Sequence, residues 1–294
     1  MTAPTGGPGL VGGGTPDLDP AYVGDVVRRA LAEDLAGGED VTSAATVPAD
    51  QTATGDLVAR ADGVVAGLPV AQVVFATVDP AIRYQPAKRD GDRVRRGDVL
   101  ATVTGPTRSL LTAERTALNL LCHLSGVATA TAQWVDAVAG TGARIRDTRK
   151  TTPGLRALEK YAVRQGGGVN HRMSLSDAAL VKDNHVIAAG GVAKAFALVR
   201  ARYPDLPVEV ECDSVADVRE AVDAGADLIL LDNMTPAEMT EAVRIAHGVR
   251  TEASGGLTLD TARAVAATGV DFISVGALTH STKILDVALD LRES

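Results

Sequence analysis

The feature of this 294-residue sequence that most restricts its fold is a regular alternation that begins near residue 143. Short apolar runs lie near Ile145 and at 178–181, 208–210, 228–231, 249–253 and 270–275, and helical patterns lie at 154–164, 191–202, 214–224, 236–247 and 258–268. Runs this short and apolar are typical of parallel strands that are covered on both faces. The repeat therefore predicts a parallel α/β sheet, doubly wound or closed into a barrel, and six strands would leave an eight-stranded barrel incomplete.

The sequence before this repeat has a different character. Residues 1–17 are rich in glycine and proline and too poor in large apolar groups to offset the entropy of ordering, so they are predicted to be a disordered extension. A helix is expected from Asp19 to Gly37, because Asp19 precedes a proline and apolar residues recur at helical spacing. Residues 53–104 alternate short Val-rich stretches with Gly and Asp turns, which indicates a small α+β domain. A long helix interrupted near Gly126 is expected over 109–137.

Composition excludes several classes of protein. The net charge of −8 argues against general affinity for nucleic acid or anionic membranes. The charge-free run 116–135 has the length of a membrane span, but its polar residues favour a buried helix of a soluble protein. Cys122 and Cys212 lack metal-ligand spacing, and no secretory signal is evident, which favours a reduced cytoplasmic setting.

Polar residues follow every predicted strand, where parallel α/β folds place their sites. In chain order these residues are Arg149 and Lys150, then Lys182, Glu211, Asp232, the turn Ser254-Gly255-Gly256, and the turn from Ser274 to Gly276. Because the carboxyl ends of parallel strands share one edge, we expect all of these groups at one mouth. The two Gly turns, each before a helix, would cradle phosphate with backbone N–H groups.

Positive charge is concentrated in one segment of this acidic chain. Residues 143–172 carry eight basic and two acidic side chains, a net charge of +6. This predicts an anionic substrate with carboxylate or phosphate groups, gripped by Arg149, Lys150 and Arg172. The glycines at 166–168 would aim His171 and Arg172. The residues Arg156, Lys160 and Arg164 share a helix face and are expected to form a solvated or subunit-facing stripe.

Two roles remain open for Glu211 and Asp232, which end neighbouring strands. They could bind Mg²⁺ shared with substrate phosphates. Alternatively, they could hold ribose hydroxyls or balance the lysines. Glu209 should share the face of Glu211 but lie deeper, since strand side chains alternate.

Seven segments resemble those of the quinolinate phosphoribosyltransferase family. They are AERTALN at 113–119, DTRKTTPG at 147–154, KYAV at 160–163, GGG at 166–168, NHR at 170–172, VKDNH at 181–185 and EASGG at 252–256. The resemblance covers roughly residues 20–290.

The resemblance implies that quinolinate and 5-phosphoribosyl 1-diphosphate react to nicotinate mononucleotide, diphosphate and CO₂ in NAD biosynthesis, with Mg²⁺ required. The implied fold is an amino-terminal α/β sandwich at 18–117, completed by 286–294, plus an incomplete, six- to seven-stranded α/β barrel at 118–285. A homodimer with shared active sites, or a higher homo-oligomer, is implied, with Arg115 reaching the partner's site.

The implied roles divide the site residues into two overlapping groups. Catalysis is expected of Lys150, Lys182, Glu211 and Asp232, with the last two as the metal ligands. Substrate binding is expected of these residues and of Arg115, Thr148, Arg149, His171, Arg172, Ser254, Gly255, Gly256, Ser274 and Gly276. The cationic side chains, with His171, would neutralise and orient the pyridine dicarboxylate.

Three other readings remain. A nicotinate phosphoribosyltransferase would use the monocarboxylate, which the surplus of cations disfavours. A phosphosugar lyase or aldolase would use Lys182 as a Schiff-base nucleophile. A biotinyl or lipoyl carrier built on 53–104 would need a lysine at a hairpin tip, and this sequence has no such turn.

Overall fold

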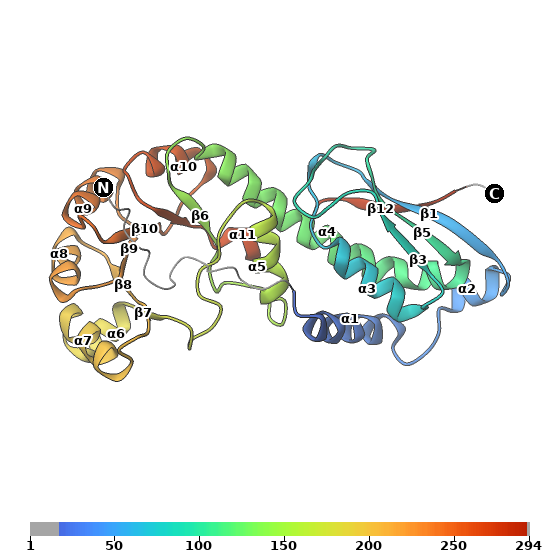
Figure 1. Ribbon diagram of the computed structural model, residues 1–294, viewed down its shortest axis with the longest axis horizontal. Coiled ribbons are helices and arrows are strands. Elements are labelled where there is room, and N and C mark those ends of the chain that lie inside the picture. Colours follow the sequence, from blue (N-terminus) through green and yellow to red (C-terminus); the bar gives the residue numbers. More distant parts are fainter. Residues whose placement is uncertain (1–17, 293–294) are drawn as a thin grey trace, which may run out of the picture. The chain divides into compact units, whose positions relative to one another are not determined.

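The computed structural model describes residues 18–292, and the predicted disordered extension lies outside this range. The chain forms two compact units (Figure 1). We call residues 133–150 and 168–277 the barrel unit, and the described residues 18–132, 151–167 and 278–292 the sandwich unit.

The barrel unit contains all six strands expected from the sequence. Its elements are β6 (Arg144–Arg146), β7 (Ala179–Val181), α6 (Asp183–Ala189), α7 (Val192–Arg202), β8 (Val208–Cys212), α8 (Val215–Ala224), β9 (Leu228–Asp232), α9 (Pro236–Ile245), β10 (Arg250–Ser254), α10 (Leu259–Ala266) and β11 (Phe272–Ser274). The short helix α6 was not expected, because it follows β7 directly with no apolar repeat to mark it. Figure 1 shows α7, α8, α9 and α10 along the outer side of the curved sheet.

The strands pair in the order β6-β11-β10-β9-β8-β7, and every pair is parallel. Within the described residues β6 and β7 do not pair with each other, so the incomplete α/β barrel predicted from the sequence is confirmed with six strands. Val169 adds one parallel bridge beside Arg146 at the β6 edge. This bridge brings the segment that carries His171 and Arg172 to the site end of β6.

Strand register places buried charged and apolar residues at aligned positions, because Glu209 is aligned with Leu228 and Glu252 with Phe272. Ala178, Leu228 and Phe272 pack together as an apolar cluster. More exposed polar residues follow at the strand ends. The aligned pairs Glu211↔Leu230 and Ser254↔Asp232 place side chains of neighbouring strands on the same face of the sheet.

The sandwich unit is built around an antiparallel sheet with the order β12-β1-β5-β3. Its elements are α1 (Pro20–Leu35), α2 (Val41–Thr46), β1 (Thr52–Ala59), β2 (Gly63–Val64), α3 (Leu68–Val78), β3 (Arg83–Pro86), β4 (Arg93–Val94), β5 (Val99–Pro106), most of α4 (Thr107–Ala137), α5 (Arg156–Gln165), most of α11 (Ala277–His280) and β12 (Val287–Leu291). Helix α1 begins as expected, because the Asp19 side chain accepts from the Ala21 N–H at 2.9 Å. Pairing of β12 with β1 joins the carboxyl-terminal segment to this sheet.

The expected domain boundary at 117–118 falls inside α4, which is a single helix of 31 residues. The expected interruption near Gly126 is wrong. A Cβ on Gly126 would lie 2.3 Å from the carbonyl oxygen of Lys283 and 2.8 Å from Ile284 Cα. The glycine therefore allows a close approach of another segment and does not end the helix.

The solvated or subunit-facing stripe expected on the helix over 154–164 is also corrected. Lys160 on α5 is fully buried, whereas Arg156 and Arg164 are half-buried. Spacing alone places the three residues on one face, but it cannot tell a solvated face from one that packs inside the unit. Within residues 18–292, no helix has the length and apolar character needed to cross a membrane.

Candidate active site

A cavity of about 380 Å³ opens at the carboxyl ends of the barrel strands. Ten of the predicted site residues line it: Thr148, Arg149, Lys150, His171, Arg172, Lys182, Glu211, Asp232, Ser254 and Ser274. Leu180, Leu230 and Glu252 complete the lining. The strand-end rule thus gathers residues from six strands and their loops into one cavity.

Four predicted residues do not line this cavity. Gly255 and Gly256 lie in the turn after β10, and Gly276 follows β11. Gly255 is held close to the turn after β9, because a Cβ there would lie 2.8 Å from the backbone nitrogen of Asn233. Arg115 lies on α4, outside the compact unit that holds the cavity.

Opposite charges meet at the mouth of the cavity. Lys182 Nζ forms an ion pair with the Glu211 carboxylate, and the Lys182 side chain is 46% exposed while that of Glu211 is 9% exposed. Asp232 accepts from the Asn233 side-chain amide at 2.6 Å. A carboxylate of the next strand therefore positions Lys182. Glu211 on β8 is aligned with Leu230 on β9, and Asp232 lies two residues beyond Leu230.

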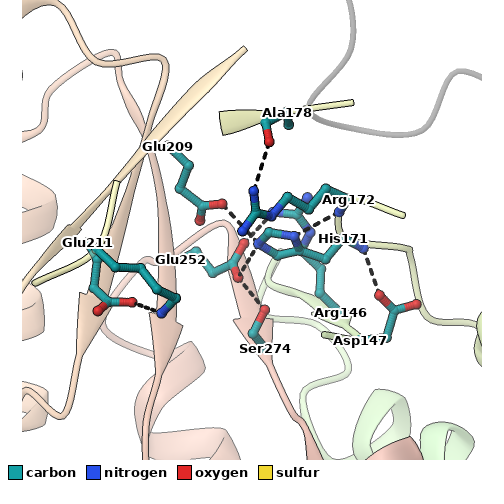
Figure 2. A network of polar contacts seen from close by, with 10 residues as sticks. Arg146, Asp147, His171, Arg172, Ala178, Glu209, Glu211, Glu252 and Ser274 are labelled. Carbon is teal, nitrogen blue, oxygen red and sulfur yellow. Dashed lines mark hydrogen bonds and ion pairs between the residues drawn. The ribbon is translucent and has the colours of Figure 1, made fainter. Parts of the chain in front are cut away.

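A buried charged layer lies below the mouth. Arg146 Nη1 pairs with Glu252, and Ser274 Oγ donates to the other oxygen of the same carboxylate. Arg146 and Glu252 are fully buried and Ser274 is 6% exposed. The guanidinium also lies over the Phe272 ring, 4.6 Å from its centroid. Three strands are thereby joined beneath the cavity by one charged network (Figure 2).

Glu209 lies beside these residues with a side-chain exposure of 1%, against 9% for Glu211, which confirms that it lies deeper than Glu211. Burial raises the pKa of Glu209 to about 7, although Arg146, Arg172 and Lys182 oppose the shift. Burial, then the charge of Glu209, raises the pKa of Glu252. The buried carboxyl groups of Glu209 and Glu252 therefore hold their protons more tightly than exposed carboxyl groups would.

Arg172 is fixed at several atoms. Its backbone N–H donates to His171 Nδ1 at 2.8 Å, and its Nη1 donates to the Ala178 carbonyl at 2.9 Å. The backbone N–H of His171 donates to Asp147 Oδ1 at 2.8 Å, and Asp147 is fully buried. Burial, then the charge of Arg149, lowers the pKa of Arg172. Two guanidinium groups thus lie close enough to repel each other and to favour an anion between them.

Sequence reasoning missed Arg146, Asp147 and Glu252. A signal for two of them exists in strand alternation: Arg146 precedes Thr148 by two positions, and Glu252 precedes Ser254 by two, so each shares the inner face with a predicted residue. Asp147 points the other way and supports the neighbouring loop. It accepts from Asn170 Nδ2 at 2.5 Å as well as from the His171 backbone.

The geometry suits a small, highly charged anion. Arg149, Lys150, Arg172 and Lys182 line one cavity, where they can neutralise carboxylates or phosphates through charge-assisted hydrogen bonds. Glu211 and Asp232 add two carboxylates on neighbouring strands, a donor set that suits Mg²⁺ or sugar hydroxyls.

The chain matches known proteins over most of its length. The family model for the quinolinate phosphoribosyl transferase N-terminal domain matches residues 40–125, and the model for the C-terminal domain matches residues 127–290. The chain is 54% identical over 273 residues to the nicotinate-nucleotide pyrophosphorylase [carboxylating] of Mycobacterium leprae, covering 91% of this chain and 96% of the relative.

Solved structures give the same result. The crystal structure of NadC from Streptococcus pyogenes matches with a TM-score of 0.90 at 43% identity, covering 95% of this chain and 100% of that chain. A quinolinate phosphoribosyltransferase [decarboxylating] of Nicotiana tabacum is 40% identical over 297 residues, covering 94% of this chain and 84% of the relative. The resemblance drawn from the sequence motifs is confirmed, and the chain belongs to the quinolinate phosphoribosyltransferase family.

Proposed function

We propose that this chain joins quinolinate to the ribosyl phosphate of 5-phosphoribosyl 1-diphosphate, releasing diphosphate and CO₂ and forming nicotinate mononucleotide for NAD biosynthesis. The observation that carries the proposal is the single cavity lined by Arg149, Lys150, Arg172 and Lys182, with two carboxylates at its mouth. Family membership supplies the reaction, and this cavity supplies the groups it needs.

Quinolinate is a planar dicarboxylate, and the cationic side chains are suited to hold it. Arg149 and Arg172 can each form paired hydrogen bonds with a carboxylate, which fixes the plane of the ring as well as its charge. Lys182, which lines the same cavity, adds a third positive charge. We place Lys150 nearer the diphosphate. The Ser254–Gly256 and Ser274–Gly276 turns are placed around phosphate oxygens.

The ribosyl transition state develops positive charge at the carbon that exchanges diphosphate for the pyridine nitrogen. Glu211 and Asp232 are proposed to stabilise this charge while holding ribose hydroxyls or Mg²⁺. Their fit to a hard cation rests on two carboxylates lining one cavity. Mg²⁺, when bound, would supply positive charge for the departing diphosphate.

Loss of CO₂ needs no further nucleophile. Once the ring nitrogen carries the ribosyl group, its positive charge stabilises the electron pair that the departing carboxylate leaves on the ring carbon, and a proton from solvent water then replaces CO₂ on that carbon. The contribution of the protein is to hold that carboxylate away from bulk water among the cations of the cavity. The half-buried Arg172 and the buried charged residues beneath it provide such surroundings.

Two further proposals concern the setting of the enzyme. We propose a homodimer, or a higher homo-oligomer, in which Arg115 completes the partner's substrate site. A cytoplasmic location agrees with the two free cysteines, both of which are buried.

The rival using Lys182 as a Schiff-base nucleophile is disfavoured by one contact. Its Nζ is held in an ion pair with the Glu211 carboxylate, so it is not free to attack a carbonyl carbon. The nicotinate rival is disfavoured by the number of cations, which exceeds what one carboxylate needs.

The deciding experiment incubates the purified chain with 5-phosphoribosyl 1-diphosphate, Mg²⁺ and either quinolinate or nicotinate. Labelled CO₂ and nucleotide are followed in both tubes, and a chelator control tests the requirement for Mg²⁺. Nucleotide and CO₂ in equal amounts from quinolinate alone support the proposal. Nucleotide formed faster from nicotinate would overturn it.

A further inference from the structure

Both ring nitrogens of His171 face protein groups. Nδ1 lies 2.8 Å from the backbone nitrogen of Arg172 and accepts its N–H. Nε2 lies 2.9 Å from Glu209 Oε2 and 3.5 Å from Glu252 Oε1. Figure 2 shows the ring between these two carboxylates on one side and the Arg172 backbone on the other.

These contacts determine where the ring carries its proton. A nitrogen that accepts a backbone N–H uses its lone pair and therefore carries no proton. A neutral or charged imidazole keeps at least one N–H, so the proton lies on Nε2, whose close neighbours are carboxylate oxygens of Glu209 and Glu252. Ionised or protonated, a carboxyl group offers an oxygen that accepts, so this assignment does not depend on the charge of Glu209.

We infer that His171 acts in this site as a neutral imidazole, protonated on Nε2 alone, which positions Arg172 for the substrate carboxylate instead of supplying a positive charge of its own. The ring links the buried carboxylates to the backbone of Arg172, whose guanidinium is anchored on the Ala178 carbonyl at the other end. The positive charge that meets the substrate then comes from the arginines and lysines of the cavity.

A cation bound by His171, Glu209 and Glu252 is the competing use of the same atoms, since their ligand atoms lie within 4.8 Å of one another. It would have to displace Arg146 and Ser274 from Glu252. The fully buried guanidinium would then lose its carboxylate, which is costly. Protein groups therefore already occupy both oxygens of Glu252, and Glu209 keeps its close contact with His171.

The first test measures the protonation of the two His171 ring nitrogens directly, by NMR spectroscopy. The full chain is labelled with ¹⁵N-histidine, and spectra correlate ring nitrogens with carbon-bound ring protons between about pH 6 and pH 8, the range in which histidine charge usually changes. Signals of His171 are assigned by their loss in His171→Asn. A constant pattern with Nδ1 unprotonated and Nε2 protonated is expected. An imidazolium pattern near neutral pH, or a proton on Nδ1, overturns the inference.

His185 provides an internal reference for these spectra. Its Nδ1 also accepts a backbone N–H, from Lys182 at 3.0 Å, but its ring is exposed and lies on α6. At the high end of the pH range both rings should show the same tautomer. Different tautomers for the two rings in that range would mean that the backbone contact does not determine the tautomer, against the inference.

The second test separates positioning from charge, and it alone rests on the proposed function. Asparagine at position 171 keeps a neutral acceptor close to the backbone, whereas alanine removes it. His171→Asn should raise KM for quinolinate by at most about tenfold, the scale of one neutral hydrogen bond, and keep the wild-type shape of the pH profile of kcat/KM. His171→Ala should raise this KM further.

Equal losses in the two variants, together with an ionisation of the wild-type pH profile that disappears in His171→Asn, would show that the histidine supplies charge. A wild-type chain without activity toward quinolinate would refute the proposed function, while the ring spectra would still decide the inference.

Discussion

Lys182, directly after β7, forms its ion pair with Glu211 near the end of β8, so a cation proposed to bind the substrate is held by a carboxylate of the same cavity. In the proposed reaction, quinolinate must share or take over this cation. The pair therefore couples substrate binding on one strand to the carboxylate proposed to stabilise the ribosyl transition state on the next.

The variant Glu211→Gln separates the two proposed roles of Glu211, which are to pair with Lys182 and to stabilise the ribosyl transition state. The neutral amide leaves Lys182 uncompensated, so the affinity for quinolinate should stay the same or rise. Turnover should fall by roughly 100-fold, the usual effect of losing one electrostatic stabiliser of a transition state. Calorimetric titration with quinolinate and steady-state kinetics measure the two effects. Loss of affinity in step with turnover would show that Glu211 acts mainly in binding.

Arg149→Ala and Arg172→Ala should each weaken quinolinate binding far more than binding of 5-phosphoribosyl 1-diphosphate. A charged hydrogen-bonding pair contributes about 2 kcal/mol, so the quinolinate Kd should rise by more than tenfold. Arg244→Ala is the matched control, because Arg244 is exposed on α9 and pairs only locally with Glu241. Equal losses for both substrates would contradict the assignment.

Some parts of this fold are determined by short segments of sequence, and others depend on contacts between distant segments. The strands and the residues at their ends could be predicted, because short apolar runs mark parallel strands and Lys182, Glu211 and Asp232 directly follow or end them. The buried partners could not. Arg146 looks like another surface cation until β10 brings Glu252 beside it, more than 100 positions along the chain.

The two wrong predictions, at Gly126 and at Lys160, have the same physical origin. Gly126 breaks a helix by propensity, but in the fold it makes room for Lys283. Lys160 reads as solvated because its spacing matches that of two other cations, but burial depends on what packs against the helix. Tertiary contacts override propensity at both positions.

A mixture of inactive subunits tests the proposed sharing of sites. Arg115→Ala and Lys182→Ala chains, each inactive alone, should recover part of the wild-type turnover when mixed, because a mixed dimer contains one site with both residues intact. Subunit exchange is verified by tagging one variant and measuring co-purification. No recovery despite proven exchange would count against an arginine contributed by the partner.

The carboxyl-terminal strand should give the sandwich unit an acid-sensitive contact. Asp56 on β1 accepts from Arg292, beyond β12, at 2.9 and 3.0 Å and from Thr102 at 2.7 Å. The bond from Arg292 is the main cause that lowers the pKa of Asp56 below 3.8. The folded state therefore releases this proton more readily than the unfolded chain, and the stabilisation is complete above about pH 4 and lost as the pH falls through the lower folded pKa.

Denaturant unfolding of Asp56→Asn and wild type at neutral and acidic pH checks this expectation. The variant should be less stable at neutral pH, and the difference should shrink as the solution is acidified. A difference that stays constant down to acidic pH would show that the loss is one of packing or hydrogen bonding and not of charge.

Two adjacent glycines after β10 offer a matched pair. Both have positive φ, +87° at Gly255 and +58° at Gly256, so alanine strains the backbone at each. Only at Gly255 would the new Cβ collide, at 2.2 Å from Asn233 Oδ1 and 2.8 Å from Asn233 N, whereas Gly256 has open space. Gly256→Ala should cost about 1 kcal/mol of stability, and Gly255→Ala should cost several times more.

Because the collision moves the turn that follows Asp232, Gly255→Ala should also raise KM for 5-phosphoribosyl 1-diphosphate. Thermal unfolding and kinetics of both variants measure this, and equal effects would show that backbone conformation, not the approach to Asn233, requires the glycine.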